Sequence, residues 1–368
     1  MRVIISGGGT GGHIFPAISI AKKIEKIMPM AEILFVGADG RMEMEKVPAA
    51  GYKIIGLPVT GMKRGFSLKN ISVLIKLIKS LKMAKKILSN FKPDVVVGVG
   101  GYASGPILYQ ATKMGIPSVI QEQNSFAGIT NKILSKKVNK ICVAYDGMDK
   151  YFPAEKIVKT GNPIRDEIIK LSHTRLNGIE KFNLNANLKT VLVIGGSLGA
   201  RTINLSVSNS LNMLNQYNIQ IIWQTGKNYY NTAKMQSLGY KNVRVHEFIY
   251  DMDIAYATAD LIISRAGAIT ISELCQLGKP AILIPSPNVS EDHQTKNAMA
   301  LVRQDAAVMM TDDEAIGSLM VTALDILTDE KKIALLSKNI KKLAIPNATD
   351  LIAKEILSIV KKTELHTS

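Results

Sequence analysis

The chain has 368 residues, 46% of them hydrophobic and 21% charged, which is typical of a folded globular protein and excludes a disordered or low-complexity one. Because domains of about 150 residues are common, this length predicts two of them. The formal net charge of +16 predicts an anionic partner, either a nucleic acid or an acidic membrane surface. No uncharged apolar run reaches the roughly 18 to 20 residues that span a bilayer, and no signal peptide precedes the first strand, so we expect a cytoplasmic or peripheral protein.

The first predicted element is a strand over Val3–Ser6, followed by the turn Gly7-Gly8-Gly9-Thr10-Gly11-Gly12-His13 and a helical pattern. Glycines in such a turn let the backbone approach a ligand, and the first N–H groups of the helix then face an anion. A lone histidine is usually structural. On a phosphate-binding turn, however, an imidazole with a pKa near 6.5 suits a general base, so we interpret His13 as catalytic. The turn also fits the dinucleotide fingerprint, with Asp39 placed to bind a ribose.

Strand-like apolar runs alternate with helical patterns along the whole chain, which predicts parallel sheets covered on both faces. Both halves are therefore expected to be doubly wound α/β, Rossmann-like domains facing an inter-domain cleft. The predicted strands cover residues 3–6, 33–36, 95–99, 118–121, 140–143 and 157–159 in the first half, and 191–194, 220–224, 243–247, 261–264, 281–285 and 307–310 in the second.

The basic apolar segment 62–92 is predicted to consist of a loop that contains Phe66 and a basic amphipathic helix that follows it. No Asp or Glu occurs from Gly51 to Pro93, whereas lysines alternate there with apolar residues at helical spacing. One interpretation is a helix packed on a sheet with a solvated lysine face. We favour a combination in which part of the helix also binds an anionic membrane. Aromatic residues make up only 5% of the chain and form no RNA-stacking motif, so we expect no nucleic-acid partner.

A third glycine turn, Gly98–Pro106, follows the strand 95–99. Glycine-rich turns often serve packing alone, but its neighbour, the basic helix, suggests that Gly100, Gly101 and Tyr102 hold the diphosphate of a second substrate. The cluster Gln121-Glu122-Gln123-Asn124-Ser125 ends the next strand, where such side chains are expected to face a ligand.

The domain boundary is placed at Gly161-Asn162-Pro163, after the strand 157–159. The resulting prediction is an N-terminal domain over 1–162 and a C-terminal domain over 163–345. The last segment, 346–368, is predicted to be helical and to pack back on the first domain.

The second half repeats the strand, glycine turn and helix arrangement at Gly195-Gly196-Ser197-Leu198-Gly199. Further along, Ala268–Thr270 at the start of a helix would offer N–H groups to a diphosphate, and Glu273 could accept hydrogen bonds from two ribose hydroxyls. The alternative for Glu273 is a helix-stabilising acid. Gln294 is a candidate sugar contact.

Two motifs are not found in the sequence: there is no pair of histidines at metal spacing and no P-loop. We therefore expect catalysis without a metal or cofactor. The two cysteines, Cys142 and Cys275, are expected to be buried free thiols.

In this order, these motifs resemble one family closely. It is the MurG family of GT-B glycosyltransferases, the undecaprenyldiphospho-muramoylpentapeptide β-N-acetylglucosaminyltransferases. The resemblance covers essentially the whole chain and is carried by Gly7–Ala17, Gly100-Gly101-Tyr102, Glu122-Gln123-Asn124, Gly161–Arg165, Gly195-Gly196-Ser197, Ser264–Ala268 and Gln294-x-x-Asn297-Ala298.

The resemblance implies transfer of GlcNAc from UDP-GlcNAc to the C4 hydroxyl of the muramoyl sugar of lipid I, a polyprenyl diphosphate glycolipid. Lipid II would form with inversion, without a metal, at the cytoplasmic face of the bacterial cell membrane. His13 would be the base. The residues that would bind UDP-GlcNAc are Thr10, Gly11, Gly12, Asn124, Arg165, Ser197, Ile249, Ala268, Ile269, Thr270, Ile271, Ser272, Glu273 and Gln294. His293 and Lys296 stand at variable positions of the family and receive no role.

Three alternatives remain at this point. A related GT-B enzyme, such as a processive glycolipid synthase or a UDP-GlcNAc 2-epimerase, would share the second nucleotide site, although an epimerase needs no basic apolar patch. A nicotinamide-dependent oxidoreductase would explain Gly7–Gly12 but not the site at 268–273. A membrane adaptor without enzymatic activity would use the patch and leave three glycine turns without a role.

Overall fold

The computed structural model describes residues 1–60, 69–169, 173–196 and 198–367. The chain divides into two compact units. The first unit consists of Met1–Ile164 together with Asn347–Ser368, and the second of Arg165–Pro346. The second unit is thus one continuous stretch, whereas the first unit is assembled from both ends of the chain.

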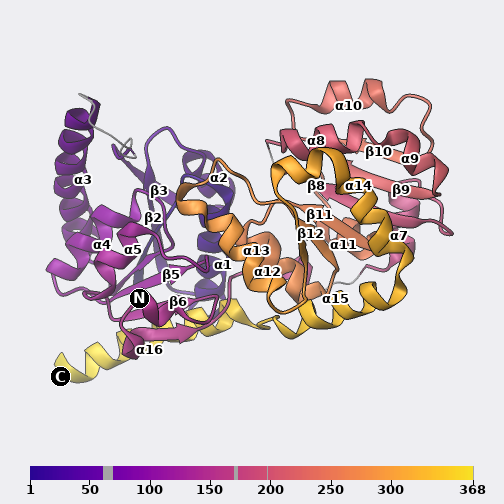
Figure 1. Ribbon diagram of the computed structural model, residues 1–368. Helices are drawn as coiled ribbons and strands as arrows, with labels where there is room; N and C mark the ends of the chain where they lie inside the picture. The colour runs from indigo at the N-terminus through magenta and orange to yellow at the C-terminus, as the bar shows by residue number, and fades with distance from the viewer. Residues whose placement is uncertain (61–68, 170–172, 197, 368) are drawn as a thin grey trace. The chain divides into compact units, whose positions relative to one another are not determined.

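The first unit is built on a seven-stranded parallel sheet with the order β3-β2-β1-β4-β5-β6-β7 (Figure 1). Its strands are nearly continuous apolar runs, as expected for a sheet that is buried on both faces. They are β1 (Arg2–Ser6), β2 (Glu32–Ala38), β3 (Lys53–Leu57), β4 (Val95–Gly98), β5 (Ser118–Glu122), β6 (Lys140–Val143) and β7 (Ile157–Lys159).

Helices cover both faces of this sheet. Val3 and Ile5 of β1 join a buried cluster with α1 and α16, whereas Ile4 faces a cluster that includes α3, α4 and α5. The C-terminal helix α16 packs against α1 and contributes Ile352 and Ile356 to the core. The helices of this unit are α1 (Gly11–Ile27), α2 (Glu43–Ala49), α3 (Lys69–Phe91), α4 (Ser104–Lys113), α5 (Ile129–Ser135), α16 (Ala348–Thr367) and the 3-10 turns η1 (Met148–Lys150) and η2 (Ala154–Lys156).

The second unit has a six-stranded parallel sheet with the order β10-β9-β8-β11-β12-β13. Its strands are β8 (Lys189–Ile194), β9 (Ile219–Gln224), β10 (Val243–His246), β11 (Leu261–Ser264), β12 (Ala281–Leu283) and β13 (Val308–Met309). Its helices are α6 (Asp166–Ile169), α7 (Arg175–Lys181), α8 (Arg201–Ser208), α9 (Leu211–Gln216), α10 (Tyr230–Gln236), α11 (Met252–Thr258), α12 (Ala268–Leu277), α13 (His293–Val302), α14 (Asp312–Thr328), α15 (Glu330–Lys342) and the 3-10 turn η3 (Ser290–Asp292).

Both sheets reverse their strand order once, between β1 and β4 in the first unit and between β8 and β11 in the second. In doubly wound sheets, ligands bind beyond the carboxyl ends of the strands at such a reversal. The turns after these four strands are the glycine turns at 7–12 and 98–101 and the turns at 195–199 and 265–267. Topology therefore places each predicted turn at the binding edge of its own sheet.

Two expectations from the sequence need comment. The short edge strand β3 was not predicted, because Lys53–Leu57 begins in a stretch without acidic residues and only Leu57 in it is buried. Among the described residues, no helix combines the length and the apolar character that crossing a membrane requires.

Candidate functional site

His13 lies in the first turn of α1, directly after the glycine turn. Thr10 has an extended backbone and begins the helix, and its carbonyl accepts the N–H of His13 at 3.1 Å. The Nδ1 atom of His13 lies 3.0 Å from the carbonyl oxygen of Gly8. A carbonyl oxygen only accepts hydrogen bonds, so Nδ1 carries the proton in this contact, and in the neutral ring Nε2 is then the basic nitrogen.

The turn after β4 packs directly against the turn that carries His13. A Cβ atom on Gly100 would lie 2.8 Å from Nε2 of His13, and one on Gly101 would collide with the Gly8 carbonyl. Both glycines also have positive φ angles, 96° and 86°. Only glycine fits here, so the structure brings the predicted diphosphate turn 100–101 against the imidazole, and Tyr102 beside it is 53% exposed.

Glu43 supports this turn and was not found from the sequence. Its carboxylate is fully buried and accepts the N–H of Gly9 at 2.8 Å and the N–H of Ala38 at 2.9 Å. A Cβ atom on Gly8 would collide with the carboxylate, and one on Gly37 would lie 2.6 Å from the Glu43 Cγ. The glycines that read as a ligand-binding motif therefore also make room for a buried acid.

The polar cluster after β5 is mostly internal, which corrects the expectation that it faces a ligand. Gln121, Glu122 and Gln123 are at most 3% exposed. Glu122 accepts the N–H of Gly128 at 3.2 Å and the Asn131 amide at 2.8 Å. These side chains hold the ends of neighbouring strands and the following loop together. Asn124, which is bonded to Glu122, is partly exposed and stays a predicted ligand contact.

In the second unit, Gln224 links the glycine turn after β8 to the segment after β10. Its amide nitrogen donates to the Gly196 carbonyl at 3.1 Å, and its oxygen accepts the N–H of Ile249 at 2.9 Å. Gln224 is 4% exposed and was missed by sequence reasoning, which had no signal for a buried amide at a strand end. The predicted donor-binding residue Ile249 and the glycine turn at Gly196 are thus tied to one side chain. Ser197 lies outside the described residues.

The start of α12 follows the strand beside β8, with Gly267 extended before it. Helix geometry gives the N–H groups of Ala268, Ile269 and Thr270 no acceptor within the helix, so they can bind an anion. The side chains of Ala268 and Ile271 are buried, at 9% and 2% exposure. Their predicted role is therefore limited to their backbones.

Glu273 lies in α12 and is held by two other residues of the second unit. Its Oε1 accepts two hydrogen bonds from Arg165, at 2.9 and 3.0 Å, and its Oε2 accepts one from the Tyr256 hydroxyl at 2.9 Å. Tyr256 is fully buried, and burial together with the neighbouring Glu273 charge raises the pKa of its phenol, which keeps it a donor. The structure thus joins two predicted donor-binding residues, Arg165 and Glu273, in one ion pair.

Gln294 begins the α13 region beside the loop after β12. Its side-chain oxygen accepts the N–H of Ser286 at 2.9 Å, and the residue is partly buried. Ser272 of α12 donates its hydroxyl to the Ala268 carbonyl at 2.9 Å. The remaining predicted residues, Thr10, Gly11 and Gly12 at the start of α1, are partly or fully exposed. The predicted donor-binding residues therefore belong to both units.

Comparison with known proteins identifies the family. The chain matches the glycosyltransferase family 28 N-terminal domain over residues 3–143 and the C-terminal domain over 190–353. The chain belongs to glycosyltransferase family 28.

Relatives in this family are similar over their full lengths. The N-acetylglucosamine transferase of Parabacteroides distasonis, named for its action on N-acetylmuramyl-(pentapeptide) pyrophosphoryl-undecaprenol, is 56% identical over 98% of this chain and 99% of its own. The protein of the same name from Bacteroides thetaiotaomicron is 55% identical over 98% of both chains. A crystal structure of Acinetobacter baumannii MurG has a TM-score of 0.79 at 29% identity and covers 97% of this chain and 99% of that one. The predicted MurG family and GT-B fold are confirmed.

One surface of this family 28 chain combines exposed apolar and basic side chains along α3. We call it the basic apolar face. The apolar members are 42–62% exposed, and the lysines between them are exposed as well. The members are Leu74, Ile75, Leu77, Ile78, Lys76, Lys79, Lys82, Lys85 and Lys86. The predicted segment began at residue 62, and its positions 62–68 lie outside the described residues.

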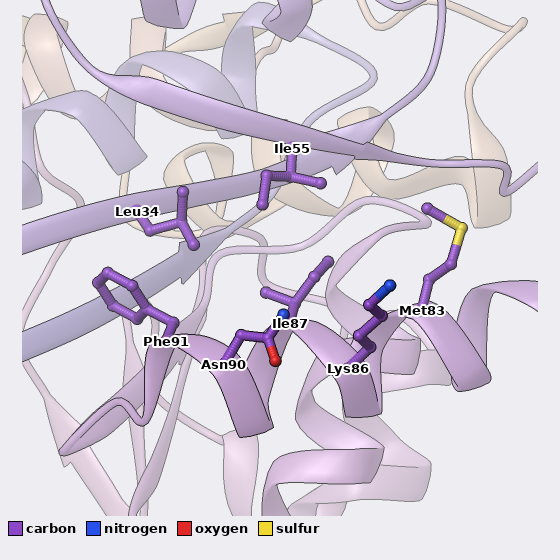
Figure 2. A pocket seen from close by; sticks show the side chains of 7 residues that line it. All are labelled: Leu34, Ile55, Met83, Lys86, Ile87, Asn90 and Phe91. Atoms are coloured by element: carbon purple, nitrogen blue, oxygen red, sulfur yellow. The ribbon is translucent and has the colours of Figure 1, made fainter.

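A pocket of about 420 Å³ lies between the C-terminal half of α3 and strands β2 and β3 (Figure 2). Its walls are mainly apolar, with Lys86 and Asn90 on α3 and Ile55 on β3. None of the residues predicted to serve the family 28 chemistry lines it. Its other lining residues are Leu34, Met83, Ile87 and Phe91.

Both cysteines of the chain are buried free thiols, as predicted, one in each unit. Burial raises the pKa of Cys142 and of Cys275 to about 12. Neither thiol is available as a nucleophile in the folded protein.

Proposed function

We propose that this chain transfers GlcNAc from UDP-GlcNAc to the C4 hydroxyl of the muramoyl sugar of lipid I, which forms lipid II and releases UDP. Full-length identity of 56% to a transferase named for this substrate carries the proposal. The first unit would act as the acceptor and membrane-associated domain, and the second as the donor-binding domain.

His13 is the proposed base. Its Nε2 takes the proton of the acceptor hydroxyl while the oxygen attacks C1 of GlcNAc and the bond from C1 to the β-phosphate breaks. Attack from the face opposite the leaving UDP inverts the configuration at C1. The contact between Nδ1 and the Gly8 carbonyl supports this role, because it leaves Nε2 as the basic nitrogen. Gly100, Gly101 and Tyr102 beside the ring would hold the acceptor diphosphate.

The second unit is proposed to bind UDP-GlcNAc. Negative charge grows on the leaving diphosphate, and the N–H groups of Ala268, Ile269 and Thr270 are fixed donors that stabilise it without a metal. Glu273, held by Arg165 and Tyr256, would accept hydrogen bonds from the ribose hydroxyls, and Gln294 would contact the sugar. Thr10–Gly12 and Asn124 of the first unit would complete donor binding.

We also propose that the basic apolar face holds the protein at the cytoplasmic face of the cell membrane as a peripheral protein. Exposed leucine and isoleucine side chains gain free energy on entering the lipid interface, and each nearby lysine contributes about 1 kcal/mol on an anionic surface. The acceptor carries a polyprenyl chain, so residence at the membrane brings the enzyme to its substrate.

A radiolabelled transfer assay with UDP-GlcNAc and a short-chain lipid I analogue tests the proposed activity. We expect a labelled disaccharide product in the presence and in the absence of EDTA. Conversion of UDP-GlcNAc to its 2-epimer without transfer would instead establish the epimerase alternative. Loss of transfer in EDTA that added magnesium restores would overturn the metal-independent mechanism.

A further inference from the structure

The peptide unit between Gly8 and Gly9 is hydrogen-bonded on both of its sides. Its N–H, on Gly9, donates to the buried Glu43 carboxylate at 2.8 Å. Its carbonyl, on Gly8, lies 3.0 Å from Nδ1 of His13. The described chain has no cis peptide bonds, so the N–H and C=O of this unit point in opposite directions. One rigid peptide therefore connects Glu43 to His13.

The Glu43 carboxylate is itself held in place by backbone donors. Its second oxygen accepts the N–H of Ala38 at the end of β2, at 2.9 Å. The Glu43 side chain packs so closely against Gly8 and Gly37 that neither residue has room for a Cβ atom. A buried charge is costly unless its hydrogen bonds are satisfied, so this arrangement fixes both the acid and the peptide against it.

We propose that Glu43 is a positioning residue for His13. By binding the Gly9 N–H, Glu43 holds the Gly8 carbonyl on Nδ1, which keeps the proton on that nitrogen and Nε2 basic. A negative charge on one side of a peptide also polarises it, so the carbonyl on the other side becomes a stronger acceptor. Glu43 thus acts on the imidazole as a directly bonded carboxylate does in hydrolase triads, but through one peptide unit. The inference rests on the proposed role of His13 as the base.

The substitution Glu43→Gln tests the link. Glutamine keeps the shape but offers one acceptor oxygen to two N–H donors, so the Gly9 or the Ala38 N–H meets an NH₂ group. We expect kcat to fall roughly 10- to 100-fold, the range found when a residue that orients a metal-binding histidine is replaced. The KM for UDP-GlcNAc should stay unchanged. Glu25→Gln is the matched control, because it removes a carboxylate of the same unit that accepts only the Tyr52 hydroxyl, at 2.7 Å, among its described contacts.

Imidazole ¹⁵N spectra read the proton position directly, without reference to activity. The chain has five histidines, so selective ¹⁵N-histidine labelling gives few signals, and the difference spectrum of His13→Gln assigns His13. In the parent protein above pH 7 we expect a protonated Nδ1 and an unprotonated Nε2. In Glu43→Gln this pattern should give way to a mixture of both tautomers. Gly8→Ala, whose Cβ displaces the carboxylate, should have the same effect if Glu43→Gln fails to fold.

The outcomes separate the inference from the proposed function. A parent spectrum with the proton on Nε2 overturns the inference, whatever the variants do. So does an unchanged His13 spectrum in a folded Glu43→Gln protein, even where kcat falls, since Glu43 would then only brace the start of α2. If His13→Ala keeps full turnover, the proposed base is wrong, while the spectra still report whether Glu43 controls the ring.

Discussion

In each unit, a buried side chain from another element binds the backbone of the first glycine turn. That side chain is a carboxylate in the first unit and an amide in the second. In the first unit, the Glu43 carboxylate binds a turn N–H, which directs the turn carbonyl to His13. In the second unit, the Gln224 amide binds the Gly196 carbonyl instead. An amide carries no charge, and it occupies a carbonyl rather than the N–H groups that an anion needs. The first turn therefore directs a carbonyl to an imidazole, whereas in the second turn a neutral amide binds the Gly196 carbonyl.

The largest effect is expected from removing the imidazole that follows the first glycine turn. His13→Ala should reduce kcat by roughly 100-fold or more, the usual contribution of a general base, while UDP-GlcNAc affinity changes little. Steady-state kinetics with both substrates varied would measure this. His173→Ala, which removes a histidine paired with Asp253 at 3.3 Å in the second unit, is the control and should keep normal turnover. A His13→Ala enzyme with near-normal kcat contradicts the assignment.

The basic apolar face should distinguish the units in membrane binding. Replacing Lys76, Lys79 and Lys82 by Gln removes three charges worth about 1 kcal/mol each at an anionic surface, so vesicle affinity should fall by roughly 100-fold. Co-sedimentation with vesicles at low and high salt measures it, because salt screens this attraction. Activity on a short-chain, water-soluble acceptor should persist.

The matched control for this triple variant lies in the second unit. Replacing Lys331, Lys338 and Lys342 of α15 changes the net charge equally, and these lysines are also exposed. Equal loss of vesicle binding in both triple variants would show that net charge matters and the basic apolar face does not.

Replacing the Gln224 amide, which binds the Gly196 carbonyl, by a carboxylate should impair donor binding. Gln224→Glu replaces the donor to the Gly196 carbonyl by an acceptor and adds negative charge between Gly196 and Ile249. A mismatched buried polar pair costs about 1–3 kcal/mol, so we expect the donor KM to rise roughly tenfold or more. Competition by UDP measures the same loss.

Gln220→Glu is the control for this exchange. Gln220 is a buried amide of the same strand, β9, but it binds Asn185 and Thr190 at the opposite end of the sheet. This variant should lose stability and keep its donor KM. A raised donor KM in both variants would mean that general destabilisation of the unit, and not the loss of the contact between Gln224 and Gly196, weakens donor binding.

The smallest expected effect concerns acid stability of the second unit. Burial first, and the Arg244 charge second, lower the pKa of His246. The unfolded chain therefore binds more protons below about pH 6.5, and stability falls as pH drops from that value toward the folded pKa. Each unit has one buried cysteine, which a thiol reagent modifies only when that unit unfolds. Modification of Cys275 should therefore increase relative to modification of Cys142 as the pH falls from about 7 to 5. His246→Asn should remove this change, and a ratio that stays constant in the parent would contradict it.

Sequence patterns predicted the parallel sheets and the glycine turns because both depend on local signals, namely apolar runs and missing side chains. The edge strand β3 was missed because it is exposed on alternate positions and begins in a stretch without acidic residues. The cluster 121–123 was assigned to a ligand, yet its side chains bond to other loops, such as Gln121 to Asn162 at 3.0 Å. A polar residue at a strand end looks the same in sequence whether it faces a ligand or a neighbouring loop.

Glu43 and Gln224 were missed for a related reason. Each lies on an element other than the turn that it supports, 34 and 28 residues away along the chain. Glu43 and Gln224 reach the glycine turns only because β2 pairs with β1 and β9 pairs with β8. Contacts of this kind depend on tertiary structure and leave no periodic signal in the sequence.

The helix α16 has a consequence for how the protein is made. Ile352, Ala353 and Ile356 complete the core of the first unit, yet they are translated after the whole second unit. On the ribosome, the first 164 residues emerge with the face that α16 covers still open, while the contiguous second unit has all it needs to fold. The helix α16 therefore completes the core of the first unit only after the second unit has been synthesised. Interrupted synthesis leaves a product with an exposed apolar face, which marks it for chaperones and proteases before any of it can act as an enzyme.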